Sequence, residues 1–265
     1  MRNPVIKCTV PAMLALLSLA TQTEAQAQAP RAMSDAAQTP QAAAPVDFTG
    51  YWESMVTDED WVYRMVTPRP GDSAGVPLKP AGLQVMDAWD PAGDTAAGEQ
   101  CKSYGAPAIM RIPGHLHVTW QDAQTLKIET DAGRQSRLFH FVKSDADQGP
   151  RTLQGYSVAQ WELQRPAGRG AATAKPLWGA LKVTTTDLTA GYLRKNGIPY
   201  SEETQLLEYF DLVQESADDS GEAMMVLTSV VTDPVYLFQP FVTDENFLKQ
   251  PSDAGWEPSA CSAMW

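Results

Sequence analysis

Hydrophobic and polar residues alternate along the stretch from Pro113 to Val142, PGHLHVTWQDAQTLKIETDAGRQSRLFHFV. The alternating runs are short and are separated by polar, turn-forming clusters, so the pattern predicts three consecutive antiparallel strands. A short first connection sets Trp120 opposite Leu126 and Val118 opposite Ile128, which brings apolar side chains together across the pair.

The two faces of this predicted meander differ in chemistry. The face opposite the apolar one carries His115, His117, Thr125, Lys127 and Glu129 on the first two strands. On the third strand, strict alternation separates two sets of side chains: Arg137, Phe139 and Phe141 on one side, Leu138 and His140 on the other. This amphipathic meander is the strongest structural signal in the chain.

Further alternating or β-branched runs predict more strands on both sides of the meander. They cover residues 46–56, 61–66, 153–163, 177–188, 204–214 and 224–233, with an extended segment at 235–243. The segment 68–82 is rich in Pro and Gly and is expected to be loop, whereas 83–89 fits a short helix and 94–107 a second short helical or irregular piece. Eight or nine strands with short polar turns favour a mainly β fold, a closed or nearly closed antiparallel barrel with short helical and loop insertions. We expect the strand of Trp52 to close one end.

The first residues predict export from the cytoplasm. Arg2 and Lys7 precede an apolar run that is too short to span a bilayer, and small residues follow it, so residues 1–27 are typical of a secretory signal peptide. Residues 28–45 are mostly Ala, Gln, Pro and Ser and are expected to be a disordered leader. A single domain then covers residues 46–265, in the periplasm or secreted.

Charge and cysteines narrow the classes of partner. The formal net charge of −12 argues against a nucleic-acid partner, because an acidic surface repels phosphate. No hydrophobic run after the leader is long enough to predict a membrane helix. Loss of Cys8 with the signal peptide leaves Cys101 and Cys261, which we expect to form a disulfide, with two free thiols as the alternative.

The three histidines are candidate metal ligands. His115 and His117 share one face of one strand, which is a common beginning of a metal site. His140 lies two strands away in the predicted register, on the order of 10 Å from His117, so three-His coordination fails. No metal and no cofactor are predicted, and the alternative role is that of surface histidines.

Glu129 and Arg137 are candidates for a site because an arginine can hold a carboxylate through two hydrogen bonds. Strict alternation directs them to opposite faces, but a bulge at Gly133–Arg134 would bring them together. They would then either hold a ligand carbonyl or carboxylate inside a cavity, or form an ordinary ion pair between strands.

Further carboxylates and phenols occur in or beside the later strands. Tyr156, Trp161, Glu162, Tyr200, Ser201, Glu202, Glu208 and Tyr209 form this set. Carboxylates inside an apolar barrel would have raised pKa values and could act as acids or bases without a cofactor. Alternatively, they are solvated acidic residues of an acidic protein. Motifs for a serine or cysteine nucleophile, a phosphate loop or an EF-hand do not occur in the sequence.

Several segments together resemble a group of exported Gram-negative proteins with a lipocalin-like, calycin-type barrel and no assigned activity. They are DFTGYW at 47–52, CKSYGAPAIMRIPG, ETDAGRQSRLFHF, GYSVAQWE, NGIPYSEE, EYFDL, VVTDPVYLFQPF and the terminal Cys261. The resemblance covers most of the mature chain and implies a pocket that draws on Glu129, Arg137, Tyr156, Trp161, Glu162, Tyr200 and Glu208. Many relatives have histidine at the positions of Tyr156 and Tyr200, so the departure argues against a histidine-based role here.

These observations predict a periplasmic protein that binds or carries a small hydrophobic or aromatic molecule in the barrel cavity. Its ligand contacts would include Tyr156, Trp161, Tyr200, Glu208 and His117. The alternative is a cofactor-independent hydrolase, lyase or isomerase in the same cavity, with Glu129 or Glu162 as base and Arg137 stabilising negative charge. A third hypothesis is an interaction protein of the cell envelope.

Overall fold

The computed structural model describes residues 38–56, 69–143, 149–164, 178–214 and 223–264. The predicted signal peptide and the predicted strand at 61–66 lie outside these residues, so export stays a prediction. In the described part, no helix has the length and apolar character needed to cross a membrane.

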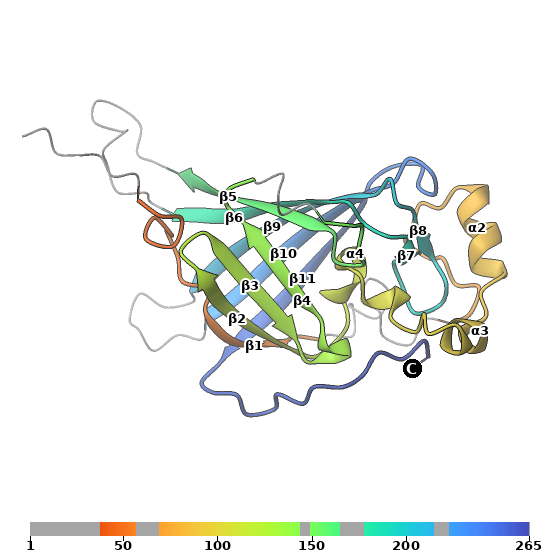
Figure 1. The fold of residues 1–265 in the computed structure, drawn as a ribbon, viewed down its shortest axis with the longest axis horizontal. Helices are drawn as coiled ribbons and strands as arrows, with labels where there is room; N and C mark the ends of the chain where they lie inside the picture. Colours follow the sequence, from red (N-terminus) through yellow and green to blue (C-terminus); the bar gives the residue numbers. More distant parts are fainter. Residues whose placement is uncertain (1–37, 57–68, 144–148, 165–177, 215–222, 265) are drawn as a thin grey trace, which may run out of the picture. The chain divides into compact units, whose positions relative to one another are not determined.

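Nine strands of the described chain form a closed barrel, which confirms the predicted mainly β architecture (Figure 1). Their order around the barrel is β1-β11-β10-β9-β6-β5-β4-β3-β2, and β1 pairs with β2 to close it. The strands are β1 (Gly50–Ser54), β2 (His115–Asp122), β3 (Thr125–Thr130), β4 (Ser136–His140), β5 (Tyr156–Gln164), β6 (Trp178–Thr186), β9 (Gln205–Gln214), β10 (Ala223–Thr232) and β11 (Phe241–Gln250).

The meander of β2, β3 and β4 has the predicted register. Trp120 pairs with Leu126, and Val118 pairs with Ile128, between β2 and β3. Val118, Leu126 and Ile128 are buried inside the barrel. The apolar face therefore points inward, because the turn lengths and the alternation specify the same pairing.

Two features of the barrel differ from the sequence prediction. β4 and β5 pair in parallel, through Phe139 with Ser157 and His140 with Val158, so the barrel is not wholly antiparallel. β11 extends from Phe241 to Gln250, well beyond the extended segment expected at 235–243. Alternation fixes which face a residue occupies but not the direction in which a strand enters the sheet, so the parallel pair carried no signal.

One half of the barrel interior is an apolar core. Phe139 on β4, Phe210 on β9 and Leu227 on β10 are at most 1% exposed and belong to one hydrophobic cluster. Trp52 is fully buried in the same cluster, and its indole Nε1–H donates to the backbone oxygen of Phe48 at 2.8 Å. The first strand thus contributes its tryptophan to the core.

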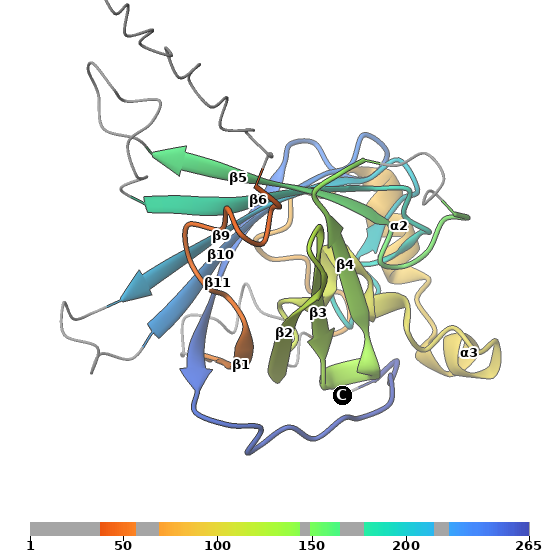
Figure 2. The same cartoon turned by 60° about the vertical axis from the view of Figure 1, so that its left-hand side comes forward.

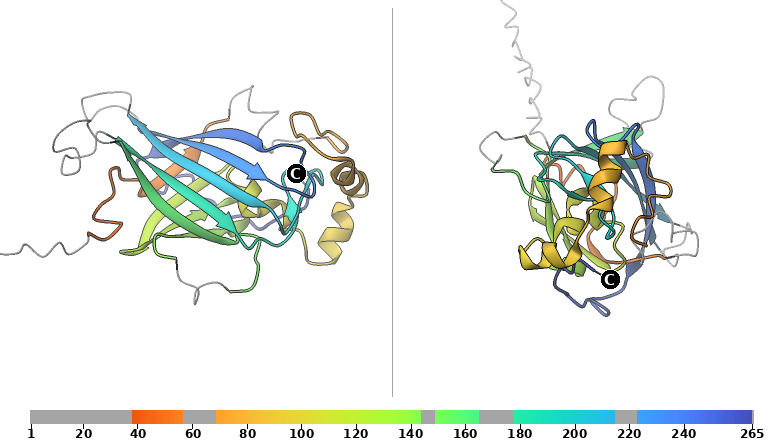
Figure 3. Two further views of the ribbon diagram at one scale, coloured as in Figure 1. Left: turned by 90° about the horizontal axis from the view of Figure 1, so that it is seen from above. Right: turned by 90° about the vertical axis from the view of Figure 1, so that its right-hand side faces the viewer.

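Short helices and a small hairpin gather at one end of the barrel and form what we call the cap (Figures 1 and 3). The cap comprises α2 (Pro80–Asp87), α3 (Pro91–Ala96), η1 (Lys102–Tyr104), α4 (Ala106–Ile109), β7 (Gly191–Tyr192) and β8 (Pro199–Tyr200). β7 pairs with β8, and a second hydrophobic cluster joins Met86, Leu193, Ile198 and Phe241. The helical segment 80–109 and the β7–β8 hairpin therefore lie together at one end of the barrel.

The other end of the barrel is covered by residues 38–49, which include part of the segment predicted to be a disordered leader. The indole Nε1–H of Trp161 donates to the backbone oxygen of Pro40 at 2.9 Å, and Gln41 donates to Ala123 at 3.3 Å. Residues 40 and 41 of this segment thus contact the barrel rim. Residues 28–37 of the predicted leader lie outside the described residues.

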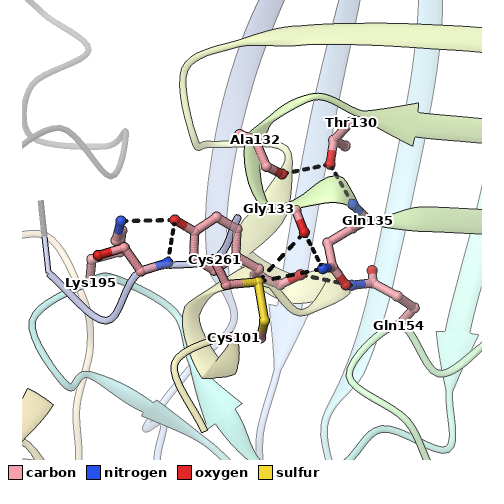
Figure 4. The surroundings of a disulfide bond; sticks show 10 residues. Cys101, Thr130, Ala132, Gly133, Gln135, Gln154, Lys195 and Cys261 are labelled. Atoms are coloured by element: carbon pink, nitrogen blue, oxygen red, sulfur yellow. Dashed lines mark hydrogen bonds between the residues drawn. A yellow bond between two sulfur atoms is a disulfide. The ribbon is translucent and has the colours of Figure 1, made fainter. Parts of the chain in front are cut away.

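The predicted disulfide is confirmed, with Cys101 bonded to Cys261 (Figure 4). It fastens residues 251–264, which we call the C-terminal strap, to the cap, and the strap passes outside the ends of β1, β2 and β3 (Figure 2). Ser259 donates its backbone N–H to Asp131 at 2.9 Å, and Trp256 lies edge-on to Tyr51. The short 3-10 helix η2 (Ala132–Arg134) connects β3 to β4, and Arg134 donates to the backbone oxygen of Pro258 in the strap.

Candidate functional site

The space inside the barrel, the lumen, holds a buried ion pair. Arg137 on β4 donates from Nη1 and Nη2 to the two carboxylate oxygens of Glu208 on β9, at 2.7 and 2.6 Å. Both residues are at most 1% exposed, and Arg137 also reaches Thr185 at 3.4 Å. The pair joins strands that are separated by β5 and β6, so it bridges the lumen. The sequence predicted that Arg137 and Glu208 would face a cavity, but it did not predict that they would contact each other.

A second buried arginine interacts with this pair through its charge. Arg111, at the end of α4, is 2% exposed and donates to the backbone oxygens of Pro107 and Leu193 at 2.6 and 2.8 Å. Burial lowers the pKa of Arg111 to about 10, and the negative charges of Glu245 and Glu208 oppose that effect. Arg111 and Arg137 are thus both engaged by contacts within the protein.

Glu129 does not share a face with Arg137, so the predicted grouping of these two residues is wrong. Ile128 pairs with Arg137, and Glu129 pairs with Ser136, so alternation continues through both strands without a shift of face. Gly133 and Arg134 both have positive φ, so the unusual backbone geometry lies in the turn itself. The paired residues of β3 and β4 contain no bulge that would move Glu129 to the face of Arg137. Glu129 lies on the outer face.

On that outer face, Glu129 and His117 belong to a small polar and aromatic group. Glu129 lies 2.9 Å from Lys127 Nζ and 3.5 Å from His117 Nδ1. The imidazole of His117 stacks on the ring of Tyr51, with 4.2 Å between centroids, and Trp256 of the C-terminal strap completes the group. These residues are about one-third exposed or less and face away from the lumen.

Glu162 and Tyr156 also face outward. Glu162 pairs with Lys182 at 3.0 Å beside a shallow outer groove of about 460 Å³. Burial raises the pKa of Asp211 in this groove. Tyr156 stacks on His140, with 5.0 Å between ring centroids.

Trp161 and Tyr200 occupy opposite ends of the barrel. Trp161 packs on Phe48 and Phe141 at the end of the barrel that residues 38–49 cover, which we call the mouth. A second hollow of about 490 Å³ lies there, lined by residues 41–49 and Trp120. Tyr200 is buried in the cap, and burial raises its pKa. The structure therefore divides the predicted site residues among the lumen, the outer face, the mouth and the cap.

The largest of the three hollows described lies in the cap and has a volume of about 720 Å³. We call this hollow the cleft. Its size lies within the usual range for small-molecule sites. One wall comes from α2, the floor from the junction of α2 with α3, and the other walls from β7 and the connection between β10 and β11. The lining residues are Ala81, Gln84, Val85, Ala88, Trp89, Asp90, Gly93, Asp94, Tyr192, Val235 and Tyr236.

Asp94 fixes the aromatic walls of the cleft. Its carboxylate accepts from the indole Nε1–H of Trp89 at 3.2 Å, from the hydroxyl of Tyr192 at 3.3 Å and from Lys102 Nζ at 3.3 Å. Burial, and then the nearby Asp94 charge, raise the pKa of Tyr192 to about 12, so this phenol stays protonated and can donate. The carboxylate thus orients two aromatic rings toward one space.

Asp90 contributes a second carboxylate to the cleft. It caps the N-terminus of α3, where one side-chain oxygen accepts from the backbone N–H of Ala92 at 3.0 Å. Gly93 has no side chain, and a Cβ there would lie 2.8 Å from the other oxygen of Asp90. The glycine therefore leaves room beside that oxygen.

Sequence reasoning did not select the residues that line the cleft. They come from three segments far apart in the chain, and alternation does not report on such an arrangement. The available signals were local: an Asp-Pro pair that starts a helix at Asp90–Pro91, and Trp89 directly before it.

Among the described residues, no group of three or more His, Cys, Asp or Glu side chains is arranged to hold a metal ion. Comparison of the chain with family models, curated proteins and solved structures finds no match.

Proposed function

We propose that this protein binds a small hydrophobic or aromatic molecule, and that the molecule occupies the cleft. One observation carries the proposal: Trp89, Tyr192 and Tyr236 converge, with Val85 and Val235, on a hollow of about 720 Å³. Aromatic rings with a few fixed polar groups are the usual lining of a small-molecule site.

The walls of the cleft are rigidly supported. The buried carboxylate of Asp233 accepts from the backbone N–H groups of Val235 and Tyr236 at 2.7 and 3.0 Å, and from the hydroxyl of Thr204 at 2.8 Å. Lys79, which directly precedes α2, donates its backbone N–H to Tyr236 at 2.7 Å. A preformed site loses little conformational entropy on binding, which supports a binding role.

The lumen is less well supported as the ligand site. Both carboxylate oxygens of Glu208 are engaged by Arg137, and the core side chains of the other half are in mutual contact. A ligand that used Arg137 as its anchor would have to displace Glu208 and leave its charge buried, at a cost of several kcal/mol.

Catalysis in the lumen is likewise the less favoured hypothesis. Both carboxylates predicted to act as the base, Glu129 and Glu162, lie on the outer face, and Glu208 holds Arg137. We therefore place binding before hydrolase, lyase or isomerase activity.

We also propose that the protein is exported to the periplasm and that its barrel is related to the lipocalin-like type. The pattern of residues 1–27 supports export, and the Gly50-x-Trp52 arrangement supports the relationship, since Trp52 is buried at the start of the first strand. A disulfide between Cys101 and Cys261 is in keeping with an oxidising compartment.

The site can be tested by NMR, because tryptophan side chains report on each candidate region. We expect 1-naphthalenemethanol to shift the indole N–H signal of Trp89 and to leave those of Trp52 and Trp161 unchanged. The variant Trp89→Phe assigns the first signal, and Trp161→Phe serves as the matched control. Saturable shifts at Trp52 or Trp161, with none at Trp89, would place the ligand in the lumen or at the mouth, respectively, and refute the cleft.

A further inference from the structure

The charge of the cleft restricts the ligands that it can accept. Among the described residues that line it, the ionisable side chains are Asp90, Asp94, Tyr192 and Tyr236, and none is basic. The tyrosines carry no charge at neutral pH. An anionic ligand would therefore meet two carboxylates without a cation on the lining to balance it.

The structure already contains an ammonium group at the edge of this site. Lys102 Nζ lies 3.3 Å from Asp94 Oδ1 and 5.6 Å from the centre of the Tyr192 ring. An ammonium thus contacts a carboxylate and the face of an aromatic ring at the same time, which is the arrangement that cation–π recognition uses. The position of Lys102 thus indicates that this part of the cleft favours a cationic amine.

Lys102 does not neutralise the cleft, because it also pairs with Glu99. Asp90, Asp94 and Glu99 contribute three negative charges and Lys102 one positive charge, so these four side chains together carry a net charge of −2. The oxygen of Asp90 that does not cap α3 lies beside Gly93, on the lining of the cleft. This oxygen is the one we expect a second cation to contact.

We propose that the ligand of the cleft is a cation, an amine with an apolar or aromatic body. The body would pack against Trp89, Tyr192 and Tyr236, and the ammonium would lie at the Asp90 end. This inference rests on the proposed function, and it adds the chemical class of the ligand. Neutral analogues would bind more weakly, and carboxylates most weakly.

Three probes with the same ring system and different charges test the inference. They are 1-naphthylmethylamine, 1-naphthalenemethanol and 1-naphthoate, titrated into the full disulfide-bonded chain by calorimetry at low and high salt. We expect the amine to bind roughly tenfold more tightly than the alcohol. Higher salt should reduce this preference, because it screens charge.

Two variants separate charge from structure. Asp90→Asn keeps a side chain that caps a helix well and removes one charge, so we expect it to weaken the amine several-fold and to leave the alcohol unchanged. Asp87→Asn is the matched control, since Asp87 is exposed on α2 and does not line the cleft.

Each outcome has a separate meaning. Binding of the alcohol as tight as that of the amine, or tighter binding of the naphthoate, would overturn the charge inference and leave the proposed function standing. An equal effect of Asp90→Asn and Asp87→Asn would overturn the role of Asp90. If none of the three probes shifts the Trp89 signal or releases heat, the proposed function itself fails.

Discussion

The ion pair of Arg137 and Glu208 yields the sharpest prediction on stability. Both side chains are at most 1% exposed, and they are joined by two hydrogen bonds of 2.7 and 2.6 Å. Removing one partner leaves a buried charge without its counterion, which costs about 3 to 5 kcal/mol. We expect Glu208→Leu and Arg137→Met each to lose that amount, a large fraction of the stability of an ordinary domain.

The double variant should behave quite differently. When both charged groups are replaced by apolar ones of similar volume, no buried charge is left, and such exchanges are often neutral or stabilising. Arg137→Met combined with Glu208→Leu should therefore lose about 1 kcal/mol or less relative to the parent chain. The coupling between the two positions would be about as large as either single loss.

Urea denaturation of the four oxidised proteins, followed by tryptophan fluorescence, measures these differences. A double variant whose loss equals the sum of the two single losses would refute the reasoning, because it would show that the two side chains contribute independently. The double variant also tests the site. If it folds but no longer binds the amine probe, the ligand lies in the lumen and not in the cleft.

Three further predictions concern the cap and the strap. Replacing Cys101 and Cys261 together by Ser should lower the free energy of unfolding by about 5 kcal/mol, the value of the loop-entropy model for a separation of 160 residues. Reduction of the parent chain should lower its urea midpoint similarly, and an unchanged midpoint would contradict this prediction. The raised pKa of Tyr192 means that its stabilising contribution is complete below pH 10 and is lost as pH rises through about 12; absorbance titration of Tyr192→Phe should show one fewer late tyrosine. Tyr200→Phe should change the free energy of unfolding by less than about 1 kcal/mol, because in the described structure the buried hydroxyl has no hydrogen-bond partner to lose; a loss above 2 kcal/mol would point to an unseen partner.

The sequence predicted the parts of the fold that depend on local pattern. The register of β2 and β3 followed from Trp120 and Leu126, because the same short turn that joins the strands also fixes their pairing. β11 was cut short in the prediction because Thr243 and Glu245 point inward, at positions where the pattern expects apolar residues. Polar side chains inside a barrel remove the alternation that identifies a strand.

The candidate site was harder to predict because its residues are far apart in the sequence. Arg137 was paired with Glu129, eight residues away, whereas its partner is Glu208 on the far side of the lumen. Neighbours in sequence suggest hairpin pairs, but a closed barrel also brings together residues from strands that are not adjacent. The cleft depends still more on long-range packing, since it is lined by segments at 81–94, 192 and 235–236 that lie far apart in the chain.

Asp90 and Asp94 carry the same charge, but we expect their replacement by Asn to change the affinity for the three probes differently. This difference tests the roles proposed for the two carboxylates in the cleft. Asp94 accepts from Trp89, Tyr192 and Lys102, so Asp94→Asn weakens the contacts that orient two walls and should lower the affinity for all three probes alike. Asp90 contacts only its own helix end among the hydrogen bonds described, so Asp90→Asn should reduce the affinity for the amine alone. Calorimetry with the amine and the alcohol gives the comparison. Equal losses of amine selectivity in the two variants would show that Asp94 acts through its charge and not through the walls it positions.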